Sequence, residues 1–233
     1  TCTHNLSRYL LNRRDKATAI VVKPCDSRAI NLLLNENQIQ RDKIFIIGVV
    51  CPGVVEAKWN QISETLQPRC QLCRWHTPLI YDFLVGEPPP EPPPADLYPD
   101  VVEMEARAIG ERQTFWAKHF SRCIRCYACR QACPGCYCSE CFVEQLEPLW
   151  VGIRIALAEN WIWHIIRAFH LAARCIGCNE CERVCPVDIP LHLLNRKLEK
   201  EVLELFDFQA GLDAEAVMPL ATFKKEEELG ISE

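Results

Sequence analysis

Seven cysteines fall within 22 consecutive positions, in the segment SRCIRCYACRQACPGCYCSECF at residues 121–142. Cysteine thiolates are ligands for soft and borderline metals, so the spacing of these residues decides what chemistry they support. Four of them follow the pattern C-x2-C-x2-C-x3-C with a proline next, namely Cys123, Cys126, Cys129 and Cys133. The pattern and its proline recur in Cys175, Cys178, Cys181 and Cys185. Two complete runs predict two metal clusters.

This spacing suits 4Fe–4S clusters. Three thiolates on one tight loop bind three irons of a cube, and in two-cluster proteins the fourth cysteine of each run ligates the other cube. The expected first cysteine set is therefore Cys123, Cys126, Cys129 and Cys185. The expected second cysteine set is Cys133, Cys175, Cys178 and Cys181. This part of the chain resembles the two-cluster bacterial ferredoxin family, although the 41 residues between Cys133 and Cys175 exceed what a minimal ferredoxin uses.

Zinc bound by C-x2-C pairs and free thiols packed in a core are the alternatives to clusters. Two full runs, each ending in Cys-Pro, favour clusters over both. Three cysteines of the opening segment, Cys136, Cys138 and Cys141, remain outside the two sets. Packing beside a cluster is their expected role, while weak S–H hydrogen bonds to cluster sulfur and ligation of a further metal stay open.

The segment 142–174 between the runs is predicted to be a helical insert, because apolar residues crowd one broad helical face. His164 and His170 lie in it, and we expect them to pack near the clusters, since eight thiolates already complete two sites. The aromatic and aliphatic content of 149–173 predicts docking surfaces for other subunits. A separate amphipathic helix is predicted at 191–206.

The first third of the chain has the pattern of a parallel α/β unit. Apolar runs at 18–23 and 43–50 predict buried strands, and the segment 26–38 between them predicts a helix that begins with capping residues. Cys25 and Cys51 each follow a strand. Both are therefore expected at the carboxyl edge of the sheet, where open α/β folds bind their ligands.

A helix is expected at 54–66, and the pair Cys70 and Cys73 comes after it. Together with Cys25 and Cys51, this pair supplies four thiols from three loops, which we call the third cysteine set. Four thiols at one sheet edge predict a third metal site, with buried structural thiols as the alternative.

A second resemblance covers residues 18–86. The motifs KPCDSRA, IIGVVCPG and CQLC, followed by YDFLVG, are similar in order to motifs of the β-subunit family of deazaflavin-coenzyme hydrogenases and dehydrogenases, which is related to formate dehydrogenase β subunits. The resemblance implies that the third cysteine set, Cys25, Cys51, Cys70 and Cys73, holds a 4Fe–4S cluster. Enzymatic members of that family also bind FAD, but the part that holds the flavin is not recognisable here, so FAD remains possible without support from this stretch.

The expected fold is an α/β domain with a parallel βαβ unit, joined to an α+β ferredoxin-like dicluster domain that has a helical insert and a C-terminal helix. The boundaries expected are 1–86 for the first domain, 87–100 for a proline-rich linker, 101–210 for the dicluster domain and 211–233 for a tail. Within the linker, Pro88 to Pro94 are predicted to form a semi-rigid polyproline II spacer.

Composition narrows the function. The 233 residues carry a formal net charge of -5, which gives no electrostatic footprint for nucleic acid. The most apolar stretch is interrupted by charges, so no membrane span is expected, and a cytoplasmic location is expected because no secretory signal is seen. Neither GxGxxG nor a P-loop occurs.

These observations predict an electron-transfer subunit that is itself non-catalytic. The resemblances imply partners in an anaerobic redox complex built on a hydrogenase, a formate dehydrogenase or a heterodisulfide-reductase-like enzyme. One alternative is a flavin-containing catalytic subunit acting on a deazaflavin or nicotinamide cofactor, with the flavin site supplied by residues before Thr1. The other is a structural adaptor whose clusters only hold its loops together.

Overall fold

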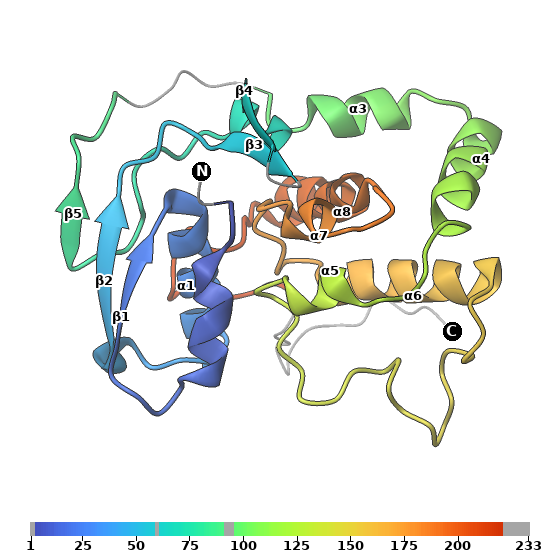
Figure 1. Ribbon diagram of the computed structural model, residues 1–233, viewed down its shortest axis with the longest axis horizontal. Helices are drawn as coiled ribbons and strands as arrows, with labels where there is room; N and C mark the ends of the chain where they lie inside the picture. The colour runs from blue at the N-terminus through green and yellow to red at the C-terminus, as the bar shows by residue number, and fades with distance from the viewer. Residues whose placement is uncertain (1–2, 59–60, 91–95, 221–233) are drawn as a thin grey trace, which may run out of the picture.

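The computed structural model describes residues 3–58, 61–90 and 96–220. A small parallel sheet forms one side of the molecule, in the order β1 (Thr18–Val22), β2 (Ile44–Val49) and β5 (Phe83–Val85). Helix α1 (Pro24–Asn35) packs beside this sheet and faces the second half of the chain (Figure 1). The predicted strand–helix–strand unit is confirmed, since β1 and β2 pair in parallel from Thr18 opposite Ile44 to Val22 opposite Gly48.

Helix α1 begins where local chemistry fixes its first turn. Pro24 occupies the first helical position, where its missing N–H costs nothing. The carboxylate of Asp26 accepts hydrogen bonds from the backbone N–H groups of Lys23 and Leu6, each at 2.9 Å. Asp26 thus acts from the third helical position, and the helix starts two residues earlier than the sequence predicted. Cys25 consequently lies within its first turn.

A hairpin replaces the helix predicted at 54–66, so that prediction was wrong. Strands β3 (Val55–Lys58) and β4 (Gln61–Leu66) are antiparallel. Apolar residues over so few positions fit either a helical or an alternating period, and the pairing of the two strands decides between them. At the base of the hairpin the Gln67 N–H donates to the Val54 carbonyl at 2.9 Å. This bond closes the hairpin, so the chain after it comes back to the sheet edge near Cys51.

Helices supply the regular structure after the sheet. Among the described residues beyond Val85 there is no strand, so the structure does not show the α+β character expected there. The predicted C-terminal helix is confirmed with its bounds as α8 (Leu191–Phe206), whereas the insert 142–174 is helical only in α6 (Leu157–His170). The remaining elements are η1 (Leu6–Asn12), η2 (Arg41–Lys43), α2 (Pro68–Gln71), α3 (Pro99–Glu105), α4 (Ile109–Phe120), α5 (Ala128–Gln131) and α7 (Glu180–Arg183).

Two of the predicted features extend beyond the described residues. The spacer predicted at Pro88–Pro94 includes residues 91–95, and the tail predicted at 211–233 includes 221–233, all of which lie outside them. Within the described ranges, no helix combines the length and the apolar character that a bilayer crossing needs.

The two halves of the chain share a hydrophobic core. Ala29 and Leu32 on one face of α1 pack with Ile176 and Cys178 from the second cysteine run and with Val202 from α8. The opposite face of α1 contributes to the core beneath the sheet. Helix α1 is therefore the element that places the sheet edge next to the second cysteine run.

The segment after α8 closes over α1. Arg28 Nη2 donates to the Ala210 carbonyl at 2.8 Å, and Asn31 Nδ2 donates to the Gly211 carbonyl at 3.2 Å. Gly211 has a φ of 76°, and a Cβ there would lie 2.3 Å from the Arg28 carbonyl oxygen. Only glycine allows this approach. The end of the described chain is thus tied to a helix near its beginning.

Candidate metal centres

The two cysteine runs adopt the same backbone conformation. The second and fourth residues after the first cysteine have positive φ in both runs, at Arg125 (50°) and Tyr127 (57°), and at Gly177 (65°) and Asn179 (52°). A short helix follows in each case, α5 or α7. Non-glycine residues in this region cost of order 1–3 kcal/mol each, and such strain gathers where a loop must hold a ligand. The repeat indicates two loops shaped for the same kind of ligand.

Cys185 of the second run lies with the cysteines of the first. Cys123, Cys129 and Cys185 are buried in one cluster of side chains, which Cys181 of the second run also joins. Burial raises the pKa of Cys123, and the neighbouring sulfurs of Cys185 and Cys126 raise it further. The structure therefore brings together the four residues of the first cysteine set.

The converse holds for Cys133 of the first run. It lines one cavity together with Cys175, Cys178 and Cys181, all from the second run. Burial raises the pKa of Cys181 to about 11. The second cysteine set is thus also gathered in space, and the exchange of the fourth cysteine between runs matches the crossed arrangement that the spacing predicts.

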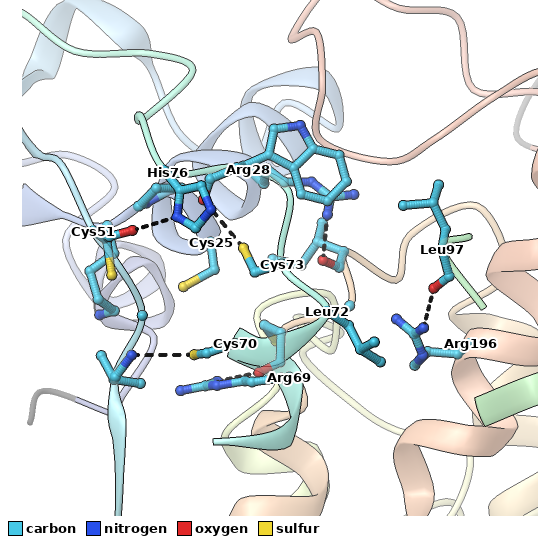
Figure 2. Close-up of a pocket in the computed structure, with 18 of the residues that line it drawn as sticks. Cys25, Arg28, Cys51, Arg69, Cys70, Leu72, Cys73, His76, Leu97 and Arg196 are labelled. Atoms are coloured by element: carbon cyan, nitrogen blue, oxygen red, sulfur yellow. Dashed lines mark hydrogen bonds between the residues drawn. The ribbon is translucent and has the colours of Figure 1, made fainter. Parts of the chain in front are cut away.

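The third cysteine set gathers at the carboxyl edge of the sheet. Cys25 comes from the first turn of α1, Cys51 from the loop after β2, and Cys70 and Cys73 from α2 and the loop that follows. All four line one cavity, with their sulfur atoms around a common hollow (Figure 2). Burial raises the pKa of Cys25 to about 12. The hairpin that replaces the predicted helix still delivers Cys70 and Cys73 to this edge.

The surroundings of the sulfur atoms fit ligated thiolates. Backbone N–H groups lie 3.4 Å from the sulfurs of Cys123, Cys185 and Cys70, one in each case, and Asn195 Nδ2 lies 3.5 Å from the sulfur of Cys181. Hydrogen bonds to sulfur are a lever by which proteins tune iron–sulfur clusters. Burial opposes the charge of free thiolates, and a bound cationic metal would offset that cost.

The thiols of these sets can be compared with the ligands of a single ion and of a cluster. In the described part of the chain, no three His, Cys, Asp or Glu side chains lie close enough to hold a single ion. A four-iron cluster takes one thiolate at each iron, so its ligands lie farther apart than those of one ion. The donor set and its N–H neighbours fit 4Fe–4S clusters bound by cysteines alone.

The second and third sets are contiguous. Cys178 and Gly177 of the second run line the same cavity as the third set. Arg69 spans the boundary, because its Nη2 donates to the Thr3 carbonyl at 2.7 Å and its Nη1 donates to the carbonyl of Cys178. Burial alone lowers the pKa of Arg69, but the sulfurs of Cys25 and Cys178 and the carboxylate of Glu180 outweigh burial and hold it above its ordinary value.

The three surplus cysteines lie together at a separate cavity. Cys136, Cys138 and Cys141 line it, and Arg167 and His170 line it with them. Among the described residues these side chains are not arranged for a single ion, and their packing role stays a prediction.

His164 packs as expected. Its ring is 2% exposed and stacks on Phe120 at 4.5 Å between centroids. Burial lowers its pKa to about 3, so the ring is neutral at ordinary pH. His170 lies edge-on to the ring of Phe142 at 5.3 Å.

Two charged residues of these centres were not predicted from the sequence. Arg69 and Arg167 are buried beside sulfur atoms, although arginines in helices usually extend into solvent. For Arg167 a signal was available, because it follows the buried Trp163 by one helical turn and so shares its face. For Arg69 no periodic pattern marks the position.

Comparisons with known proteins agree with this geometry. Residues 171–190 match the model of the 4Fe-4S binding domain family, and this range holds the whole second run. The chain is 24% identical to the F420-dependent formate dehydrogenase subunit beta of Methanocaldococcus jannaschii, over 89% of the chain and 76% of that protein. It is 23% identical to the F420-dependent formate dehydrogenase 1 subunit beta of Methanococcus maripaludis, over 87% of the chain and 75% of that protein.

Both resemblances seen in the sequence are therefore confirmed. The chain carries a 4Fe–4S binding domain and is similar over most of its length to β subunits of formate dehydrogenases. It is an iron–sulfur electron-transfer protein of the kind that works as one subunit of a larger enzyme.

Proposed function

We propose that this chain holds three 4Fe–4S clusters in series and relays single electrons between the catalytic subunits of an anaerobic redox complex. Among the complexes expected from sequence, a formate dehydrogenase is favoured over a hydrogenase or a heterodisulfide-reductase-like enzyme, because both relatives are formate dehydrogenase subunits. The observation that carries the proposal is the shared cavity, in which Cys178 of the second set lies with all four cysteines of the third set.

Each set neighbours the next, which supports transfer in series. The third set lies against Cys178, and the second set lies against the first, where the sulfur of Cys129 contributes to the raised pKa of Cys181. Electrons that enter at the sheet edge would therefore leave through the first set, or pass in the opposite direction. Cys126 of the first set is exposed, which supports that end as a point of exchange with a partner.

Different residues of the chain would bind, shield and electrostatically stabilise the clusters. A 4Fe–4S cluster supplies reversible uptake of one electron when bound. The cysteines hold the irons as thiolates, the cores around them exclude water, and backbone N–H groups point at sulfur. Arg69 and Arg167 place positive charge beside the sulfur atoms, which offsets the negative charge that ligation and reduction bring into the interior.

Iron stoichiometry tests the number of sites. Protein prepared without oxygen should contain about twelve irons per chain, against about eight if only the first two sets bind clusters. Cys73→Ser should lose about four irons and keep the spectra of the other two clusters, while Cys138→Ser, a matched loss of a surplus cysteine, should lose none. Iron near eight in the unaltered chain would remove the third cluster from the proposal.

Reduction distinguishes a relay from an adaptor. Electron paramagnetic resonance of the dithionite-reduced protein should show spins from each cluster, because a relay needs every cluster to accept an electron. Clusters that accept no electron at any accessible potential would instead indicate a structural role.

A second candidate function comes from the names of the relatives. Both are F420-dependent, and such an enzyme needs a subunit that exchanges electrons with its coenzyme. A flavin-containing catalytic subunit, acting on a deazaflavin or nicotinamide cofactor, is therefore the competing proposal. Flavin extracted stoichiometrically from the purified chain would favour it, and its absence from active complex would favour the relay.

A further inference from the structure

Arg167 brings an unusual charge into the ferredoxin half. It lies on α6 and is only 3% exposed. Its Nη2 donates to the Cys129 carbonyl at 3.0 Å, and its Nε has no hydrogen-bond partner among the described residues. It lines a cavity with Cys136, whose thiol it contacts. A buried guanidinium with so little to bond requires compensating negative charge.

The compensating groups come from both cysteine runs. Burial alone lowers the pKa of Arg167, but neighbouring sulfurs outweigh it and hold the pKa well above its ordinary range. The sulfurs responsible are those of Cys136, Cys133, Cys129 and Cys181. Cys129 belongs to the first set, whereas Cys133 and Cys181 belong to the second. Contact with the first set is direct, through the Cys129 carbonyl. Cys181 of the second set packs in the same buried cluster as Cys129 and Trp163, one helical turn before Arg167, so its sulfur lies close enough for its charge to act on the guanidinium.

We propose that Arg167 is a counter-ion shared by the two ferredoxin-type clusters and raises the reduction potential of both. The inference rests on the proposed function for the presence of the clusters, and it adds what sets their potentials. Reduction adds one negative charge to a cluster, so a fixed positive charge stabilises the reduced form more than the oxidised form. Because the site is buried, solvent screens this attraction less than it would at the surface. Arg167 is thus a positioning residue for charge and ligates nothing itself.

Three variants separate its charge from its shape. Arg167→Lys keeps the positive charge and changes the geometry, whereas Arg167→Gln removes the charge and keeps a polar donor. Arg14→Gln is the matched control, since it removes the same charge from an exposed turn before β1. Each potential is measured by redox titration of the whole chain, followed by electron paramagnetic resonance of the two ferredoxin-type clusters.

The expected result is a common shift. In Arg167→Gln, the ratio of reduced to oxidised cluster at a fixed potential should fall about tenfold for both clusters, which for a one-electron couple is about 59 mV. Arg167→Lys should stay nearer to the unaltered protein, and Arg14→Gln should not differ from it. Unchanged potentials in Arg167→Gln, equal shifts in the lysine and glutamine variants, or a shift confined to one cluster would each overturn the proposal.

Loss of iron is also decisive. If Arg167→Gln fails to retain its clusters while Arg167→Lys retains them, the clusters need the charge, and the proposal stands. If the lysine variant loses them as well, the guanidinium serves the fold rather than the charge balance, and the proposal fails. The iron content of the unaltered chain tests the proposed function separately, because the argument on Arg167 concerns the potentials.

Discussion

Arg69 and Glu180 form a buried ion pair between the two halves of the chain, with Nη1 and Oε1 2.8 Å apart and side chains 8% and 2% exposed. Arg69 directly precedes Cys70 of the third set, and Glu180 directly precedes Cys181 of the second. One ion pair therefore holds two of the proposed metal centres in register. A buried pair of this kind adds little net stability as a pair, but removing one partner leaves the other uncompensated.

The ion pair predicts which of two substitutions destabilises the fold more. Glu180 also pairs with Arg183 at 2.6 Å, so Arg69→Met leaves the carboxylate one partner. Glu180→Gln instead removes the carboxylate that compensates Arg69 and leaves it neutral acceptors and the nearby sulfurs, and we expect it to cost about 3–5 kcal/mol of folding free energy. Thermal melts under anaerobic conditions should place Glu180→Gln below Arg69→Met. The reverse order would show that the carboxylate, not the guanidinium, bears the larger burial cost.

Crossed ligation predicts which cluster each mutation damages. Cys185→Ser should broaden or abolish the signal of the cluster bound by Cys123, Cys126 and Cys129, because Cys185 lies with them. Cys133→Ser should damage the other cluster, whose ligands line its cavity. Electron paramagnetic resonance of the two variants measures this. Damage to the cluster within the same run in either variant would contradict the crossed assignment.

A loop ahead of α6 presents apolar side chains to solvent. Ile153 is 79% exposed and Ile155 is 61% exposed, and the loop also exposes Leu146, Leu149 and Trp150. We expect this surface to bind a partner subunit, since contiguous exposed apolar residues mark such sites. The double variant Ile153→Glu, Ile155→Glu should lose co-purification with the complex, and the isolated chain should aggregate less.

The control for this surface is another exposed leucine. Leu205 on α8 is 70% exposed, and Leu205→Glu should leave the complex intact. We also expect the unaltered chain to be unstable or to aggregate when it is purified without its partners. A stable, soluble monomer with every cluster in place would count against docking through this loop.

His164 predicts a dependence of stability on pH. Its folded pKa of about 3 lies below the ordinary value of 6.5, so the unfolded chain binds the proton more readily between those values. The free energy of unfolding should therefore fall as the pH drops through 6.5 and level off near 3, with a loss of about 2 kcal/mol between pH 8 and pH 5. His164→Phe preserves the stacking on Phe120 and should remove this part of the decline. Melting temperatures at the two pH values, compared between the variant and the unaltered chain, measure it, and equal declines would contradict the assignment.

The elements that the sequence predicted well are those with long periodic patterns. The helix at 191–206 repeats its apolar residues over four turns, and its bounds are as predicted. The strands at 18–23 and 43–50 are short but strongly apolar, which suits buried parallel strands. The hairpin of β3 and β4 was missed because its stability comes from pairing between strands, which no local pattern records.

The candidate site shows the same contrast between local patterns, which the sequence records, and tertiary contacts, which it does not. The cysteines were predictable because the ligand spacing of a cluster is written into consecutive residues, as in Cys175, Cys178 and Cys181. The cavity shared by Cys178 and the third set depends on how α1 packs, and that is a tertiary relationship. The ion pair of Arg69 with Glu180 joins residues 111 positions apart, and a charge in a sequence does not show its partner.

The closure of the last described segment over α1 determines when this helix can finish packing during synthesis. Arg28, Asn31 and Asn35 donate to carbonyls of residues 210–216, which a ribosome makes some 180 residues later. Until those residues are made, the three side chains lack these carbonyl acceptors, so the first helix cannot complete its final packing. Until then, the packing around the cysteines at the sheet edge beside this helix is incomplete. We therefore expect iron to be retained at that edge only after residues 210–216 have been made, and the first half expressed alone should not retain iron there.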